Sequence, residues 1–97
     1  MMDNPAFVEK LASQLRSQLE TNGLTAEVKF ETVTGTKMFR FYVVSDGFAD
    51  MIHSERQSLV WRIADHVLEP SESIKISMIM TLTRDEFGDS EPVVKTG

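Results

Sequence analysis

The stretch that decides the fold is Met38-Phe39-Arg40-Phe41-Tyr42-Val43-Val44, which is followed directly by Ser45-Asp46-Gly47. Aromatic and β-branched residues dominate it, and both of its alternating faces are apolar apart from Arg40. A strand of this kind is covered on both sides, as a strand in the middle of a sheet is. We therefore predict a central strand over 38–44 that ends at Ser45-Asp46-Gly47.

The preceding segment predicts a partner for this strand. Apolar and charged residues alternate over 26–31, which is the pattern of a half-buried strand. Gly35 supplies a turn between the two runs. We expect the segments 26–32 and 38–44 to form an antiparallel hairpin.

An amphipathic helix is predicted before the hairpin. Asn4 and Pro5 fit an N-cap and a first helical residue, and apolar residues then recur at spacings of three and four. Asn22-Gly23 ends this run.

A second helix is predicted after the central strand. The sequence Ser54-Glu55-Arg56-Gln57 fits a capping box, so the helix is expected over about 54–68, with a short helical turn over 49–53 before it. Pro70 is expected to close it.

The last strand is predicted over 74–82, where Ile76, Met78 and Met80 lie on one parity. Met51, Met78 and Met80 are expected to fill the core, although a Met-rich surface would also suit an adaptable binding site. Trp61 lies off the main apolar stripe of its helix, either as an exposed anchor or as a cover for the edge of the core.

The predicted order is helix-strand-strand-helix-helix-strand. The helical connection is long enough for a right-handed crossover, so the last strand should run parallel to the central one. The fold class is α+β, a two-layer sandwich whose three-stranded mixed sheet carries its helices on one face. We expect a single domain over 1–87 and a flexible tail over 88–97.

Composition excludes several classes of protein. The chain has 97 residues, a net charge of -5 and no Cys, so a disulfide framework, a thiolate metal site and a Cys nucleophile are absent. No stretch resembles a signal peptide or a membrane span, and a cytoplasmic, soluble protein is expected. The scattered cations argue against a protein that coats nucleic acid.

Chemistry-bearing motifs are scarce. His53 and His66 are thirteen residues apart without a carboxylate placed to complete a metal site. No serine lies in a nucleophile elbow, and Gly47 stands alone in its loop rather than in a phosphate-binding glycine pattern. We expect no enzyme, no catalytic residue and no metal site.

Arg56 falls inside the apolar stripe of its predicted helix. One interpretation is that it lies beyond the edge of the sheet and extends to water. The other is that its guanidinium lies beside the loop over 45–48, where the carboxylate or phosphate of a partner could dock.

Three features together resemble the BolA family over about 7–87. They are Val43-Val44-Ser45-Asp46-Gly47-Phe48 at the end of the central strand, Arg56 eight residues after that Phe, and the closing Thr81-Leu82-Thr83-Arg84-Asp85-Glu86-Phe87. The resemblance implies a class II KH-like fold. It also implies pairing with a monothiol glutaredoxin around a shared iron–sulfur cluster, and some members are linked to transcription and cell shape.

The sequence departs from the family pattern in the long helix and at the two positions, the start of the last strand and the hairpin loop, that would ligate iron. Gln57 stands where the family has the His of Arg-His-Arg, and Lys75 stands where the family has the His that opens the last strand. The hairpin loop, where the family has His or Cys, has neither between Glu31 and Met38. Because Lys is protonated at neutral pH, we expect no iron–sulfur ligand and no cofactor.

The expected function is that of a BolA-like protein-binding or regulatory domain. Its predicted binding residues are Ser45, Asp46, Phe48, Arg56, Gln57 and Lys75. The expected partner is a protein, with a monothiol glutaredoxin as the candidate, and the oligomeric state stays open. The alternative is a KH-like module that touches nucleic acid through Arg56, Arg62 and Lys75.

Overall fold

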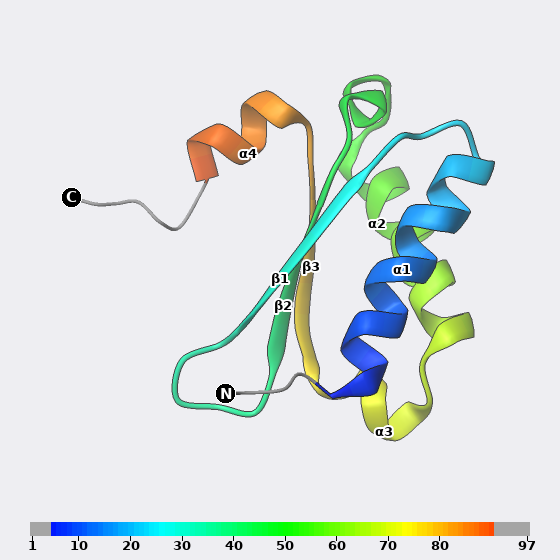
Figure 1. The fold of residues 1–97 in the computed structure, drawn as a ribbon. Coiled ribbons are helices and arrows are strands. Elements are labelled where there is room, and N and C mark those ends of the chain that lie inside the picture. The colour runs from blue at the N-terminus through cyan, green and yellow to red at the C-terminus, as the bar shows by residue number, and fades with distance from the viewer. Residues whose placement is uncertain (1–4, 91–97) are drawn as a thin grey trace.

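The computed structural model describes residues 5–90 (Figure 1). Its elements are α1 (Ala6–Thr21), β1 (Glu27–Thr32), β2 (Phe39–Val44), the 3-10 helix η1 (Asp46–Asp50), α2 (His53–Val67), α3 (Pro70–Ser73), β3 (Ile76–Leu82) and α4 (Arg84–Ser90). None of the helices in this range is long and apolar enough to cross a lipid bilayer. The predicted cap Asn4 and the segment 91–97 of the predicted tail lie outside the described residues.

The sheet has three strands in the order β1-β2-β3. β1 pairs antiparallel with β2, and β2 pairs parallel with β3. The central position of β2 explains why its apolar residues are buried on both faces. The predicted sheet topology is confirmed.

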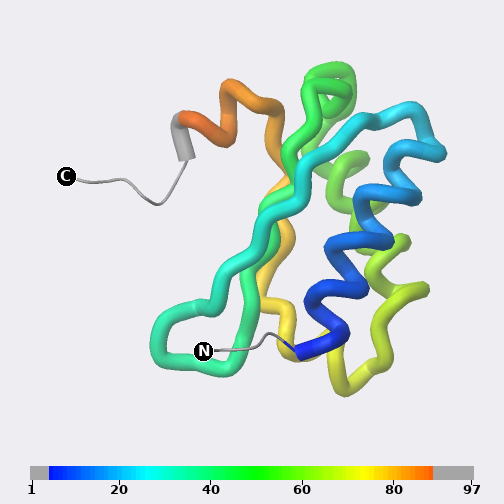
Figure 2. Tube along the Cα trace, viewed as in Figure 1, coloured from blue at the N-terminus to red at the C-terminus, as the bar shows by residue number. Residues whose placement is uncertain are grey.

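Two layers form the molecule. α1 and α2 lie together on one face of the sheet, as Figures 1 and 2 show. The core between the layers contains Leu11 and Leu15 of α1, Phe41 and Val43 of β2, and Val60 of α2. Burial of these apolar side chains is the main stabilising contribution to such a fold.

α4 lies against the opposite face of the sheet. Its Phe87 ring makes an edge contact with the ring of Tyr42, with 5.8 Å between the ring centroids. Tyr42 neighbours Phe41 and Val43 in β2, and alternate residues of a strand point to opposite faces. α1 and α2 therefore share one face as predicted, and α4 touches the other.

An irregularity in β3 reverses the face that its methionines occupy. Phe39 pairs with Ile76 and Arg40 pairs with Met78, so Ser77 is an extra residue in β3. An inserted residue exchanges the two faces of the following strand. The prediction that Met78 fills the core is therefore wrong, and its side chain is 44% exposed.

The start of α2 differs from the prediction. The helix begins at His53, and the N–H of Ile52 donates to Oε1 of Glu55 at 3.2 Å. Ser54 lies inside the first turn and does not cap the helix, so the predicted capping box is wrong. The preceding helical turn is η1, where Ser45 Oγ accepts the N–H of Gly47 at 3.3 Å.

Two helix boundaries differ from the prediction. α2 ends at Val67, and Pro70 does not close it but opens α3 as its first residue. At the other end of the sequence, α1 begins at Ala6, so Pro5 precedes the helix rather than opening it.

α4 is a helix that the sequence did not predict, and it extends into the tail over 88–97 that was expected to be flexible. Thr83 Oγ1 accepts the N–H of Glu86 at 3.2 Å, and Glu86 Oε1 accepts the N–H of Thr83 at 2.8 Å. This reciprocal pair is a capping box, which satisfies two donors at the helix start. The chain is therefore helical as far as Ser90.

Candidate functional site

Two of the predicted binding residues are interior. The Ser45 side chain is 2% exposed and caps η1, and Phe48 is part of the core. Neither side chain is accessible to a partner in this structure. The loop over 45–48 forms the start of η1, which turns the Phe48 side chain into the core and brings the Ser45 hydroxyl to the N–H of Gly47.

Arg56 is also enclosed, with 9% of its surface exposed. Its Nε donates to the carbonyl of Met51 at 3.1 Å, and its Nη1 donates to the carbonyl of Thr81 at 3.1 Å and to Glu86 Oε1 at 2.8 Å. The guanidinium also lies over the Phe48 ring, 5.6 Å from its centroid. Arg56 therefore neither extends to water nor offers its charge to a partner, since the carboxylate beside it belongs to this chain.

The contact with Arg56 changes the acidity of its partner. The hydrogen bond from the Arg56 guanidinium, assisted by the N–H of Thr83, lowers the pKa of Glu86 below its usual range. Glu86 is thus ionised at every pH at which an ordinary glutamate is ionised. Its carboxylate links α4 to Arg56 of α2 through this ion pair.

Asp46 is exposed and supports the same helix. Its Oδ1 accepts the backbone N–H of Arg84 at 3.1 Å, and its Oδ2 lies 3.8 Å from Nε of Arg84. The side chain of Arg84 is largely exposed, so this ion pair contributes little. Asp46 therefore helps to position the start of α4.

Lys75 lies apart from the other predicted residues. Its carbonyl accepts the N–H of Phe39 at 2.8 Å, and its Nζ lies 6.0 Å from the centroid of the Phe7 ring. Six residue steps along β3 separate Lys75 from Thr81, whose carbonyl contacts Arg56, and these steps span roughly 20 Å. The six predicted residues therefore do not form one surface.

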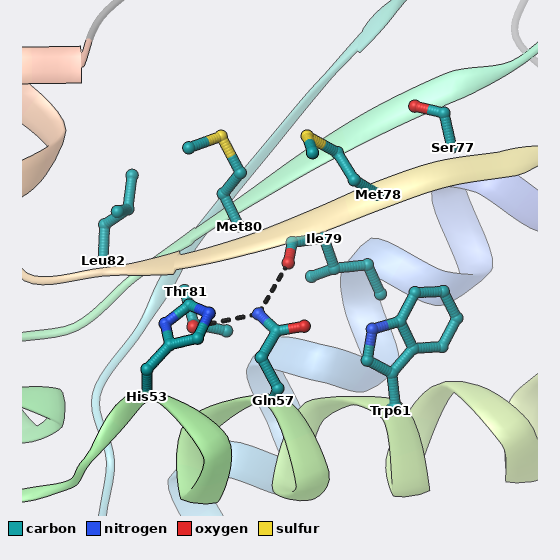
Figure 3. A pocket seen from close by; sticks show the side chains of 9 residues that line it. All are labelled: His53, Gln57, Trp61, Ser77, Met78, Ile79, Met80, Thr81 and Leu82. Atoms are coloured by element: carbon teal, nitrogen blue, oxygen red, sulfur yellow. Dashed lines mark hydrogen bonds between the residues drawn. The ribbon is translucent and has the colours of Figure 1, made fainter.

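Gln57 is the predicted residue that borders a groove (Figure 3). The groove has a volume of about 380 Å³ and runs between α2 and β3. Its lining comprises His53, Gln57, Trp61, Ser77, Met78, Ile79, Met80, Thr81 and Leu82. None of these nine residues is Lys, Arg, Asp or Glu.

Gln57 bridges the groove to the outer edge of β3. Its Nε2 donates to the carbonyl of Ile79 at 2.8 Å and to Oγ1 of Thr81 at 3.1 Å. Figure 3 shows the amide oxygen pointing away from these acceptors, on the side of Trp61. The amide nitrogen of Gln57 therefore occupies the carbonyl of Ile79 at the strand edge. The amide oxygen of Gln57 faces the groove.

Trp61 and Met78 give the groove its apolar character. Trp61 is partly buried and packs against the core cluster, so it covers the edge of the core as well as lining the groove. In the sequence, the position of Trp61 outside the main apolar stripe of its helix was the feature that indicated this surface. Met78 could not be placed in the same way, because its face depends on the irregularity in β3.

A polar cluster lies on the sheet face opposite α1 and α2. Arg40 Nη1 donates to Glu31 Oε2 at 2.9 Å, and the Tyr42 hydroxyl donates to the same oxygen at 2.8 Å. Burial, chiefly, raises the pKa of Tyr42 above its usual value. The cluster joins β1 to β2 through side chains paired across the strands.

The residues present do not fit an iron–sulfur cluster. Lys75 and the hairpin loop lie at the same end of the sheet, so the positions that the resemblance implies do come together. They offer an ammonium group and a loop without His or Cys. Within residues 5–90, no group of three or more His, Cys, Asp or Glu side chains could hold a metal ion.

Comparisons with known proteins bear on the fold. No family model matches the sequence, and no curated protein is similar to it at a significant level. The structure is similar to the solved structure of BolA1 from Arabidopsis thaliana, with a TM-score of 0.51 and 22% sequence identity. The similarity covers 88% of this chain and 98% of that chain. The chain therefore has a BolA-like fold, as its sequence predicted.

Proposed function

We propose that this chain is a small protein-binding or regulatory domain, that it is not an enzyme, and that it binds its partner in the groove between α2 and β3. The observation that carries the proposal is the chemistry of this groove. It combines an aromatic ring, flexible methionines and an amide, with no Lys, Arg, Asp or Glu in its lining. Such surfaces suit protein partners, whose contacts centre on apolar and aromatic anchors.

A monothiol glutaredoxin is the partner to test first. The resemblance to the BolA family implies this partner, and the BolA-like fold of the chain supports that resemblance. In this proposal the domain associates with the glutaredoxin without supplying iron ligands. Lys75 and the hairpin loop support this part, since neither provides an imidazole or a thiolate. The cytoplasm is the proposed compartment.

Titration of the protein with a monothiol glutaredoxin, followed by NMR, tests the proposal. Met78→Glu should weaken binding about tenfold or more, because it places an unpaired charge in an apolar contact. Ser58→Glu adds the same charge on the exposed outer side of α2 and should leave the affinity unchanged. Equal effects of the two substitutions, or shifts confined to other surfaces, would contradict the groove as the binding site.

The alternative function is a KH-like nucleic-acid-binding module. It depends on Arg56, Arg62 and Lys75, of which Arg56 is buried against Glu86 and Lys75 lies at the far end of β3. Phosphate contacts make affinity fall steeply with salt concentration. Binding to a random single-stranded oligonucleotide with a steep salt dependence would favour this alternative over the protein-binding function.

A further inference from the structure

We propose that the free edge of β3 accepts an extended peptide as an additional strand, and that Gln57 closes this edge when no peptide is bound. The inference rests on the protein-binding function and specifies the form of the partner. An added strand gains affinity from main-chain hydrogen bonds and specificity from alternate side chains.

The two edges of the sheet differ in charge. β1 carries Glu27, Lys29 and Glu31 along its edge, whereas β3 has no charged residue and no Pro between Lys75 and Arg84. Charged side chains and Pro are the usual protection of an edge strand against pairing with another chain. β1 has this protection in its sequence, and β3 does not.

The backbone of β3 presents groups at this edge. The carbonyl of Leu82 accepts the N–H of Ser45 at 2.9 Å and therefore points toward β2. Alternate residues of a strand direct their N–H and C=O groups to opposite edges, so Ile79 and Thr81 direct theirs outward. The hydrogen bonds that the carbonyls of these two residues accept from Gln57 and Arg56 agree with this direction.

Gln57 can release the edge more readily than Arg56 can. Arg56 is enclosed and held by several partners, whereas Gln57 is half-buried at the wall of an open groove. Rotation of its side chain frees the carbonyl of Ile79 for the N–H of an incoming strand. The outward N–H groups of Ile79 and Thr81 can then donate to the carbonyls of that strand.

The groove also defines the side chains of the partner. Residues of one parity in an added strand would face Trp61 on α2, and those of the other parity would lie beside Met78 and Met80. Both surroundings are apolar and uncharged, so an uncharged, apolar strand complements them. A nucleic acid strand does not, because the lining has no Lys or Arg to neutralise its phosphates.

The probe is a short peptide of alternating Thr and Val, blocked at both ends, added to the full chain up to about 1 mM. We expect NMR shifts concentrated at the amides of Ile79 and Thr81. N-methylation of two adjacent central residues blocks both edges of the peptide, so it should weaken binding about tenfold or more. Gln57→Ala should tighten binding about threefold to tenfold, since the hydrogen bonds of Gln57 to the edge no longer compete. Ser58→Ala, on the outer side of α2, should leave it unchanged.

Three results would overturn the proposal and separate it from the broader function. Equal binding of the methylated and unmethylated peptides would exclude strand addition while leaving protein binding intact. Absence of shifts with the unmodified peptide would also exclude strand addition, and the glutaredoxin titration would then decide the broader function by itself. Binding of a single-stranded oligonucleotide in place of the peptide would overturn both.

Discussion

The guanidinium of Arg56 joins elements that are distant in the sequence. It reaches the carbonyls of Met51 and Thr81 and the carboxylate of Glu86. The sequence placed Arg56 on the apolar side of its helix, which is correct. It could not name Glu86 as the partner, because that contact spans thirty residues and exists only once α4 docks.

Replacement of Arg56 should reveal how much its hydrogen bonds contribute to the stability of the fold. Arg56→Met keeps an unbranched apolar stem but leaves the carbonyl of buried Thr81 without its donor, so we expect a loss of about 2 kcal/mol in the free energy of unfolding. Arg62→Met, on the exposed side of the same helix, should change it by less than about 0.5 kcal/mol. Urea denaturation measures both, and similar losses would mean that Arg56 is not a structural bridge.

At the scale of elements, the regular strands and long helices were predictable and their ends were not. Apolar periodicity fixed α1, β1 and β2 because each buries one or both faces. The predicted start of α2 was wrong by one residue. Glu55 accepts the N–H of Ile52, three residues before it, and Gln57 has the same spacing from Ser54, so the sequence offered two equivalent starts. α4 was missed because its capping residues Thr83 and Glu86 precede no long apolar run.

The start of α2 can be tested by two substitutions. Ser54→Ala should change the free energy of unfolding by less than about 0.3 kcal/mol, because Ser54 has no capping role in this structure. Glu55→Ala removes the acceptor of the Ile52 N–H and a negative charge from the first turn, so it should cost about 0.5 kcal/mol. Urea denaturation curves give both values, and the reverse order would restore Ser54 as the cap.

The docking of α4 should depend on pH. The pKa of Glu86 is lowered in the folded state, so its contribution is present above the unfolded pKa, near the ordinary 4.5, and is lost as the pH falls through the lower folded pKa. The ring contact of Phe87 with Tyr42 should weaken over that acidic range, as followed by aromatic NMR signals. Glu86→Gln should remove the pH step while Asp85→Asn keeps it. A step that persists in Glu86→Gln would assign it to another carboxylate.

At the scale of the whole molecule, the topology followed from the sequence and the binding surface did not. A central strand apolar on both faces and a helical crossover allow few arrangements of three strands. The predicted binding residues do not form one surface, because Lys75 precedes β3 at one end of the sheet and Arg56 contacts Thr81 near the other end. The groove could not be predicted from the sequence, because the extra residue Ser77 decides which face of the sheet Met78 occupies.

The iron chemistry of the partner tests the molecule as a whole. Lys75 lies at the end of β3 beside the hairpin loop, and both lack an iron ligand. Mixed with a cluster-loaded monothiol glutaredoxin, the protein should leave the absorption and paramagnetic spectra of the cluster unchanged. Lys75→His should move the spectra toward a mixed-ligand form, because a neutral imidazole can donate to iron where an ammonium cannot. Lys29→His, on β1, is the matched control and should have no effect. If the unmodified protein already shifts the spectra, His53 or His66 reaches the iron, and the assignment of both as non-ligands is wrong.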